Sequence, residues 1–177
     1  MSKVVLEQFR RCDVVLVCGL PGSGKSFFAK KYFAKSGRKR VNRKEIIQSL
    51  YEMITFNDKW AEDKYDFVDE SLAKHIEKKI VEHLFQIGEP LLIDNISISS
   101  LSRETYITLA KQSKKTISAI FINTDIATCL KRNRERDPKD FVPESVISKY
   151  FARIEYPDHK EGFKDVLVID NFDNELK

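Results

Sequence analysis

The sequence predicts an α/β protein with a five-stranded, mostly parallel sheet. Short apolar runs alternate with longer amphipathic segments, which is the pattern of a parallel α/β sheet. A glycine-rich turn directly follows the first apolar run and precedes a helical pattern. The composition agrees with this fold class, because 42% of the 177 residues are hydrophobic and 33% are charged, as in ordinary globular proteins.

Five apolar runs are the expected strands. The first, over 13–18, is almost entirely aliphatic, as expected for a strand that is buried on both faces. The five expected strands span 13–18, 38–41, 90–94, 116–122 and 165–169. Amphipathic spacing predicts helices near 25–35, 43–53, 64–87, 101–113, 125–135 and 142–154, followed by a loose tail over 171–177.

Composition excludes several classes of protein. No apolar run is long enough to span a membrane, and the first residues lack the apolar stretch of a signal peptide. Three cysteines (Cys12, Cys18 and Cys129) form neither a disulfide framework nor a metal-ligand spacing, which fits a reducing cytoplasm. We therefore expect a cytoplasmic protein without membrane association. The net charge of +4 permits a polyanionic partner without requiring one.

The glycine-rich turn matches the phosphate-binding motif G-x-x-x-x-G-K-[ST] at every fixed position. Its glycines allow the backbone to approach phosphate groups closely, and successive N–H groups then bind the anion at the start of a helix. Lys25 is expected to reach the β- and γ-phosphates of ATP, and Ser26 to bind Mg²⁺. The expected nucleotide-binding residues are Gly19, Leu20, Pro21, Gly22, Ser23, Gly24, Lys25, Ser26 and Phe27.

A carboxylate follows the third expected strand. Asp94 ends this strand, and ligands of open α/β sheets bind beyond the carboxyl ends of the strands. We expect Asp94 to lie near Mg²⁺ or near an acceptor hydroxyl. The alternative is that Asp94 only caps the turn over 95–99.

A basic run over 131–139 is the expected lid. Arg132 and Arg136 are four residues apart and are expected to share one helix face, from which they would close over the γ-phosphate. The alternative is a solvated helix end, where basic residues are favoured by the helix dipole. With the phosphate-binding loop present, we favour a lid over about 131–155.

These features together resemble the P-loop polynucleotide 5′-hydroxyl kinases, the kinase domains of phage and cellular end-healing enzymes, within a broader group of zeta-toxin-like kinases. The resemblance covers 13–170. It rests on 19–26, 41–43, 92–95 and 130–136, the last followed by Val142-Pro143. It implies a three-layer α/β/α P-loop fold in a single domain over 1–177, with no residues left over for a second catalytic domain. It also implies that Arg43 and Asn95 bind the acceptor.

The chain departs from this family at one position that matters for catalysis. The family has an acidic general base directly after Asn-Arg and an arginine three residues later, whereas this chain has Lys44 and Ile47. Lysine is a poor base at neutral pH unless it is strongly desolvated. Glu45, the nearest carboxylate, is either a replacement base or an exposed first-turn acid that suits the helix dipole, and both interpretations stay open.

The sequence therefore predicts an ATP- and Mg²⁺-dependent kinase whose acceptor is the 5′-OH end of DNA or RNA. Glu45 or Asp94 would activate the acceptor hydroxyl. The alternatives are a kinase for a nucleoside or another small metabolite, and a nucleotide-binding switch or degenerate kinase without the usual aspartate. Candidates for contact with acceptor phosphates are Arg38, Lys39, Arg40 and Arg43. For Phe56 and Trp60, packing under a loop is favoured over an acceptor-groove wall.

Overall fold

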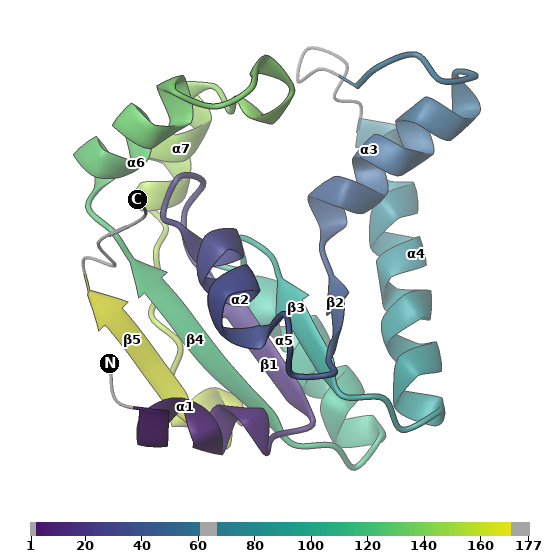
Figure 1. Ribbon diagram of the computed structural model, residues 1–177, viewed down its shortest axis with the longest axis vertical. Coiled ribbons are helices and arrows are strands. Elements are labelled where there is room, and N and C mark those ends of the chain that lie inside the picture. Colours follow the sequence, from purple (N-terminus) through teal and green to yellow (C-terminus); the bar gives the residue numbers. More distant parts are fainter. Residues whose placement is uncertain (1–2, 61–66, 171–177) are drawn as a thin grey trace.

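The computed structural model describes residues 3–60 and 67–170, with a single sheet at the centre (Figure 1). The predicted tail over 171–177 and the first three residues of the helix expected at 64 lie outside the described residues. Five strands form the sheet in the order β2-β3-β1-β4-β5. They are β1 (Val14–Cys18), β2 (Lys39–Val41), β3 (Leu91–Asp94), β4 (Ile117–Asn123) and β5 (Val166–Asp170).

Every strand pair in this sheet is parallel, which confirms the predicted fold class. In the central strand, Val14 lies between Leu91 of β3 and Ile117 of β4. Because all strands run the same way, their carboxyl ends meet at one edge of the sheet, where open α/β folds bind ligands. The phosphate-binding loop leaves β1 at this edge.

Seven α-helices and two 3-10 turns are present among the described residues. They are α1 (Lys3–Arg10), α2 (Lys25–Phe33), α3 (Arg43–Ile54), α4 (Phe67–Gln86), α5 (Ser100–Gln112), α6 (Ile126–Arg134), η2 (Pro138–Asp140), α7 (Glu144–Phe151) and η3 (His159–Glu161). The six predicted helices are confirmed with small shifts of their ends, whereas α1 was not predicted.

Two apolar layers cover the two faces of the sheet. Val14 and Leu16 of β1 pack on one side with residues from α4 and α5, and Val15 and Val17 pack on the other with residues from α1 and α2. Figure 1 shows α2 in front of the sheet and α5 behind it. Burial on both faces explains why β1 is apolar at every position.

Arg38 fastens α1 to the sheet. Its guanidinium donates hydrogen bonds to the carbonyls of Phe9, Arg10 and Cys12 at the end of α1, and to those of Asp13 and Leu91. The last carbonyls of a helix have no partner within the helix, so an arginine satisfies them well. Arg38 is therefore committed to the fold, and the prediction that it contacts acceptor phosphates is wrong.

Two further properties bear on the expected class of protein. Among the helices of 3–60 and 67–170, none combines the length and the apolar character needed to cross a bilayer. The three cysteines, Cys12, Cys18 and Cys129, are buried and have free thiols.

Candidate functional site

The phosphate-binding loop (the P-loop, residues 19–26) connects β1 to α2. Gly22 and Gly24 have φ values of 83° and 93°, in the left-handed region that favours glycine. A Cβ atom at Gly19 would lie 2.6 Å from the carbonyl oxygen of Ile122, and one at Gly22 would collide with the carbonyl oxygen of Cys129 in α6. The loop is therefore held closely between β4 and α6.

Lys25 lies under this loop with its ammonium group directed at the loop backbone. Its Nζ donates a hydrogen bond to the carbonyl of Leu20 at 3.3 Å. Burial lowers the pKa of Lys25 to about 8; the Asp94 carboxylate opposes this shift, whereas the positive charges of Arg136 and Lys44 add to it. An anionic phosphate bound at this position would favour the charged form of the amine and raise its pKa again.

Asp94 lies at the end of β3, opposite the start of α2. The carboxylate is fully buried, and its Oδ1 accepts a hydrogen bond from Ser26 Oγ at 3.2 Å. Hydroxyl and carboxylate oxygens are the ligands that Mg²⁺ prefers in proteins. The oxygens of Ser26 and Asp94 are thus of a kind that fits Mg²⁺, and the metal site itself stays a prediction.

Arg40 joins the two carboxylates that the sequence proposes as bases. Its Nε and Nη2 donate to Asp94 Oδ2 at 3.0 and 2.7 Å, and its Nη1 donates to both oxygens of Glu45 at 2.8 and 2.9 Å. The sequence suggested Arg40 only as a phosphate ligand. No local sequence pattern predicts that Arg40 pairs with Asp94, because the two residues are 54 positions apart in the chain.

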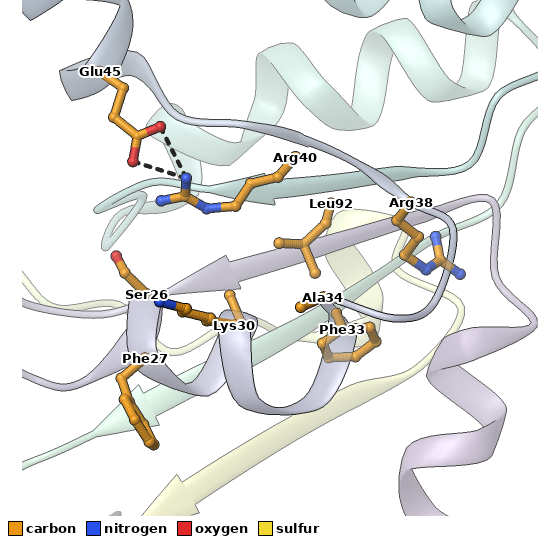
Figure 2. Close-up of a pocket in the computed structure, with 10 residues that line it drawn as sticks. Ser26, Phe27, Lys30, Phe33, Ala34, Arg38, Arg40, Glu45 and Leu92 are labelled. Atoms are coloured by element: carbon orange, nitrogen blue, oxygen red, sulfur yellow. Dashed lines mark hydrogen bonds and ion pairs between the residues drawn. The ribbon is translucent and has the colours of Figure 1, made fainter.

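A pocket of about 540 Å³ opens beside this bridge (Figure 2). Ser26 lies on one side of it, and Arg40 with its ion pair to Glu45 lies on the other. Phe27, the last predicted nucleotide-binding residue, points away from Arg40 and Glu45 in Figure 2. Its ring lies under Lys31, with Nζ 5.8 Å from the ring centroid.

Arg43 and Asn95 occupy a buried polar network. Arg43 Nε donates to Glu77 Oε2 at 2.7 Å, and its Nη2 donates to the hydroxyl of Tyr106 at 3.0 Å. The side chain of Asn95 donates to Glu77 and Tyr106, and accepts from the backbone N–H of Arg43. Burial and the Glu77 carboxylate raise the pKa of Tyr106. These side chains hold the start of α3 against the end of β3. That Arg43 and Asn95 bind the acceptor, as predicted from the sequence, stays a prediction.

The roles of Glu77 and Tyr106 were not predicted from the sequence. Glu77 is 2% exposed and lies on α4, and Tyr106 is 3% exposed and lies on α5. The available signal was the acidic residue on the apolar side of the predicted helix, one position after Ile76. A buried carboxylate requires a partner, and here the partners come from three other elements.

The predicted lid over about 131–155 covers the end of α6, η2 and α7. These elements, which we continue to call the lid, lie beyond the carboxyl ends of the strands, across from α3 (Figure 1). Arg132 Nη1 lies 3.4 Å from the carbonyl oxygen of Ser23 in the P-loop. The positive charge of Arg136 helps to lower the pKa of Lys25. Arg136 also donates to the carbonyl of Asp140 at 3.4 Å. Arg132 thus lies beside the P-loop, whereas Arg136 is bonded within the predicted lid, and their closure over a γ-phosphate stays a prediction.

The expectation that Arg132 and Arg136 share one helix face is wrong. Helix α6 ends at Arg134, and Arg136 lies in the turn that follows. Asp137 precedes Pro138 and adopts φ −52° and ψ 136°. A residue before proline is disfavoured in the helical region, so the helix stops before Arg136.

The lid also reaches α3. Lys44 Nζ lies 3.4 Å from Asp140 Oδ1, and Gln48 Nε2 donates to the same oxygen at 3.4 Å. Lys44 therefore faces the lid and the P-loop from the position where the resemblance implies an acidic base. Ile47 instead packs in an apolar cluster with Leu50 and Trp60.

The two aromatic residues after α3 differ in environment. Trp60 is buried and packs edge-on against Tyr51, with the ring centroids 5.5 Å apart, which confirms the packing interpretation. Phe56 is 93% exposed and has a φ of 58°. For Phe56, the packing interpretation is wrong.

Curated proteins are similar to this chain in sequence. A curated relative from Methanococcus maripaludis, named L-seryl-tRNA(Sec) kinase, is 23% identical over 83% of this chain and 54% of its own length. A relative from Acanthamoeba polyphaga mimivirus, named as a bifunctional polynucleotide phosphatase/kinase, is 25% identical over 95% of this chain and 36% of its own. The chain thus spans about half or less of the curated relatives that it matches.

Solved structures confirm the fold. A chain of the Pnkp1/Rnl/Hen1 RNA repair complex superposes with a TM-score of 0.65 and 24% identity, over 85% of this chain and 46% of that one. A family model described as an AAA domain matches residues 14–157, from β1 to the segment after the lid. These matches confirm the resemblance at the level of a P-loop kinase domain. The chain belongs to the AAA domain family.

Proposed function

We propose that the protein is a phosphotransferase that moves the γ-phosphoryl group of ATP to a hydroxyl acceptor. The observation that carries this proposal is the arrangement around the P-loop, where Lys25 lies under the loop, Ser26 meets Asp94, and Arg132 approaches from the lid. A protein that only binds nucleotide has less need of arginines on a lid. Phosphoryl transfer needs them, because charge spreads over the γ-phosphoryl oxygens in the transition state.

Each residue has a defined task in this proposal. The backbone N–H groups of 19–26 and the Lys25 ammonium bind the phosphates, and Arg132 and Arg136 neutralise charge on the γ-phosphoryl group. Ser26 and Asp94 would hold Mg²⁺, which supplies charge neutralisation when bound. Arg40 keeps the Asp94 carboxylate in place through two hydrogen bonds.

As the acceptor we propose the 5′-OH end of DNA or RNA. The names of the two curated relatives describe kinases whose targets, a seryl-tRNA and a polynucleotide, contain nucleic acid. The ring of Phe56, in the loop after α3, is 93% exposed and is suited to stacking on a base. A small-metabolite kinase and a nucleotide switch are the competing functions.

The test is transfer of label from γ-labelled ATP in the presence of Mg²⁺. The acceptor panel contains 5′-OH DNA and RNA oligonucleotides, the same oligonucleotides with a 5′-phosphate, nucleosides and sugars. Label on the 5′-OH oligonucleotides and none on the 5′-phosphorylated ones is the expected result. Label on a small molecule alone would remove the nucleic-acid acceptor, and tight ATP binding without any transfer would favour the switch.

We also propose that the chain works as a single domain over 1–177 and that it resides in the cytoplasm. The buried, free thiols of Cys12, Cys18 and Cys129 suit a reducing compartment. Fractionation of the cells that express the protein, followed by detection with an antibody, tests the location.

A further inference from the structure

Three of the carboxylates around the cleft already have strong partners. Asp94 accepts from Ser26 and twice from Arg40, and both oxygens of Glu45 accept from Arg40. Glu77 is buried under Arg43, away from solvent. A carboxylate that is fully engaged by an arginine is a weak proton acceptor, because protonation would break that ion pair. None of the three is therefore well suited to take a proton from an acceptor.

Asp140 also has an ion pair, but its distance of 3.4 Å is longer than the 2.7 to 2.8 Å of these three carboxylates. It ends η2 in the lid, and only its Oδ1 atom is engaged, at 3.4 Å from both Lys44 Nζ and Gln48 Nε2. Within the part of the chain that the structure describes, no hydrogen bond is recorded to its other oxygen, Oδ2. The side chain is 41% exposed and lies where the lid meets α3. One oxygen is thus held in position, and the other is available to a ligand.

The segment that carries Asp140 also meets the P-loop. Arg132, on the helix before it, lies with Nη1 3.4 Å from the carbonyl oxygen of Ser23 in the P-loop. Arg136 donates to the backbone carbonyl of Asp140 at 3.4 Å. Asp140 is thus held on one side by a cation of α3 and on the other by a segment that contacts the P-loop.

We infer that Asp140 is the carboxylate that accepts the proton of the acceptor hydroxyl, and that Lys44 and Gln48 are its positioning residues. The inference rests on the proposed phosphotransferase function. In the step, the hydroxyl proton passes to Asp140 Oδ2, and the hydroxyl oxygen forms a bond to the γ-phosphorus. The bond between the γ-phosphorus and the β–γ bridging oxygen breaks, and ADP leaves with that electron pair. Asp140 then returns its proton to water.

This placement makes the reaction depend on the position of the lid. The base and the charge-neutralising Arg136 are held by the same segment, so both reach the acceptor only when the lid meets α3. Lys44, which occupies the position of an acidic residue in the family that the sequence resembles, then serves as the docking cation for a carboxylate from the lid. A closed cleft also limits the access of water to the γ-phosphate.

Asp140→Asn is the direct test, with Asp140→Glu as the conservative variant and Glu135→Gln as the matched control. Glu135 is an exposed carboxylate in the same lid, for which no side-chain contact is recorded among the described residues. The acceptor is whichever member of the panel the wild type phosphorylates. Loss of a general base predicts that Asp140→Asn lowers kcat by about 10²–10⁴-fold. Asp140→Glu should recover part of this loss, and Glu135→Gln should leave kcat unchanged.

Binding separates this role from a structural one. We expect the affinity of Asp140→Asn for a non-hydrolysable ATP analogue, measured by calorimetry, to equal that of the wild type. Lys44→Met should lower kcat without weakening acceptor binding, since it misplaces the base.

Several results would overturn the inference. If the contact were only a latch on the lid, Asp140→Asn would raise KM for the acceptor and leave kcat within about threefold. A kcat that falls only in proportion to lost ATP-analogue affinity would also contradict it. A wild-type protein that phosphorylates no acceptor would defeat the proposed function and this inference together, whereas an active wild type with an equally active Asp140→Asn variant would defeat the inference alone.

Discussion

The nucleotide side and the acceptor side of the cleft are built in different ways. The nucleotide side comes from one continuous segment, the P-loop over 19–26, whose conformation is fixed by glycines and by contact with the carbonyls of Ile122 and Cys129. The acceptor side is assembled from β2, α3 and the lid. Polar contacts hold these elements together, such as Lys44–Asp140 at 3.4 Å and Arg40–Glu45 at 2.8 Å.

This difference indicates which half of the site can change without loss of the other. A side chain added to a glycine of the P-loop would meet backbone atoms, and these cannot move without shifting β4 or α6. Substituting a residue at the start of α3 meets side chains that reach across the cleft and have other conformations available. On the proposed acceptor side, a lysine can therefore replace the acidic residue at position 44, provided that another carboxylate acts as the base.

The largest effect is expected at Lys25. Lys25→Met removes the ammonium that binds the phosphates, and kcat/KM for ATP should fall by about 10³-fold, as for other lost charge-stabilising donors. The variant should be at least as stable as the wild type, because burial already disfavours the charged amine. Steady-state kinetics and thermal unfolding measure the two effects. Lys35→Met, at an exposed lysine beyond α2, is the control, and an equal loss there would contradict the assignment.

Gly22→Ala tests how rigid the nucleotide side is. The added Cβ would collide with the carbonyl oxygen of Cys129, and the φ of 83° adds strain of about 1–3 kcal/mol. We expect weaker binding of an ATP analogue and a lower unfolding temperature. Gly37→Ala is a close control, because Gly37 has a φ of 76° but no atom within 4 Å of the new Cβ. Equal losses in the two variants would show that strain alone, and not the contact with α6, restricts Gly22.

The nucleotide side of the site could be predicted from the sequence better than the acceptor side. The P-loop, Lys25, Ser26 and Asp94 were found because each is specified by residues adjacent in the chain or by the end of a strand. The role of Arg40 was missed, since its partner Asp94 lies 54 residues away. The prediction that Arg132 and Arg136 share a helix face was wrong for a local reason, because Asp137-Pro138 prevents α6 from continuing.

The fold was easier to predict than the acceptor side. Strands buried on both faces leave continuous apolar runs in the sequence, so β1, β3 and β4 could be located from them. The edge strands β2 and β5 are more exposed, and β2 was located from a weaker apolar run. Helix α1 was missed because its first residues were considered only as a possible leader. Its attachment depends on Arg38, which lies beyond β1 and α2 in the chain. Contacts between distant segments leave no pattern in a single sequence.

The pH dependence of nucleotide affinity sharpens the comparison further. Burial lowers the pKa of Lys25 to about 8 in the protein without nucleotide. Below pH 8 the amine is charged and attracts phosphate, whereas above pH 8 it is neutral, so the affinity should fall by about tenfold per pH unit. Titration of an ATP analogue between pH 7 and pH 9.5 measures this. Lys25→Arg stays charged over the range, and a slope that persisted in this variant would assign the effect to another group.

The smallest effect is expected at Phe56, on the acceptor side. Its ring is 93% exposed, so Phe56→Ala should change the free energy of unfolding by less than about 0.5 kcal/mol. Alanine also keeps the strain of the left-handed φ of 58°, so the comparison isolates the ring. Stacking of one base on this ring would contribute about 1 kcal/mol, and KM for a 5′-OH oligonucleotide should rise about fivefold with KM for ATP unchanged. A KM for the oligonucleotide that does not change would place the acceptor away from the loop after α3, and the nucleic acid would then have to enter from the side of the lid.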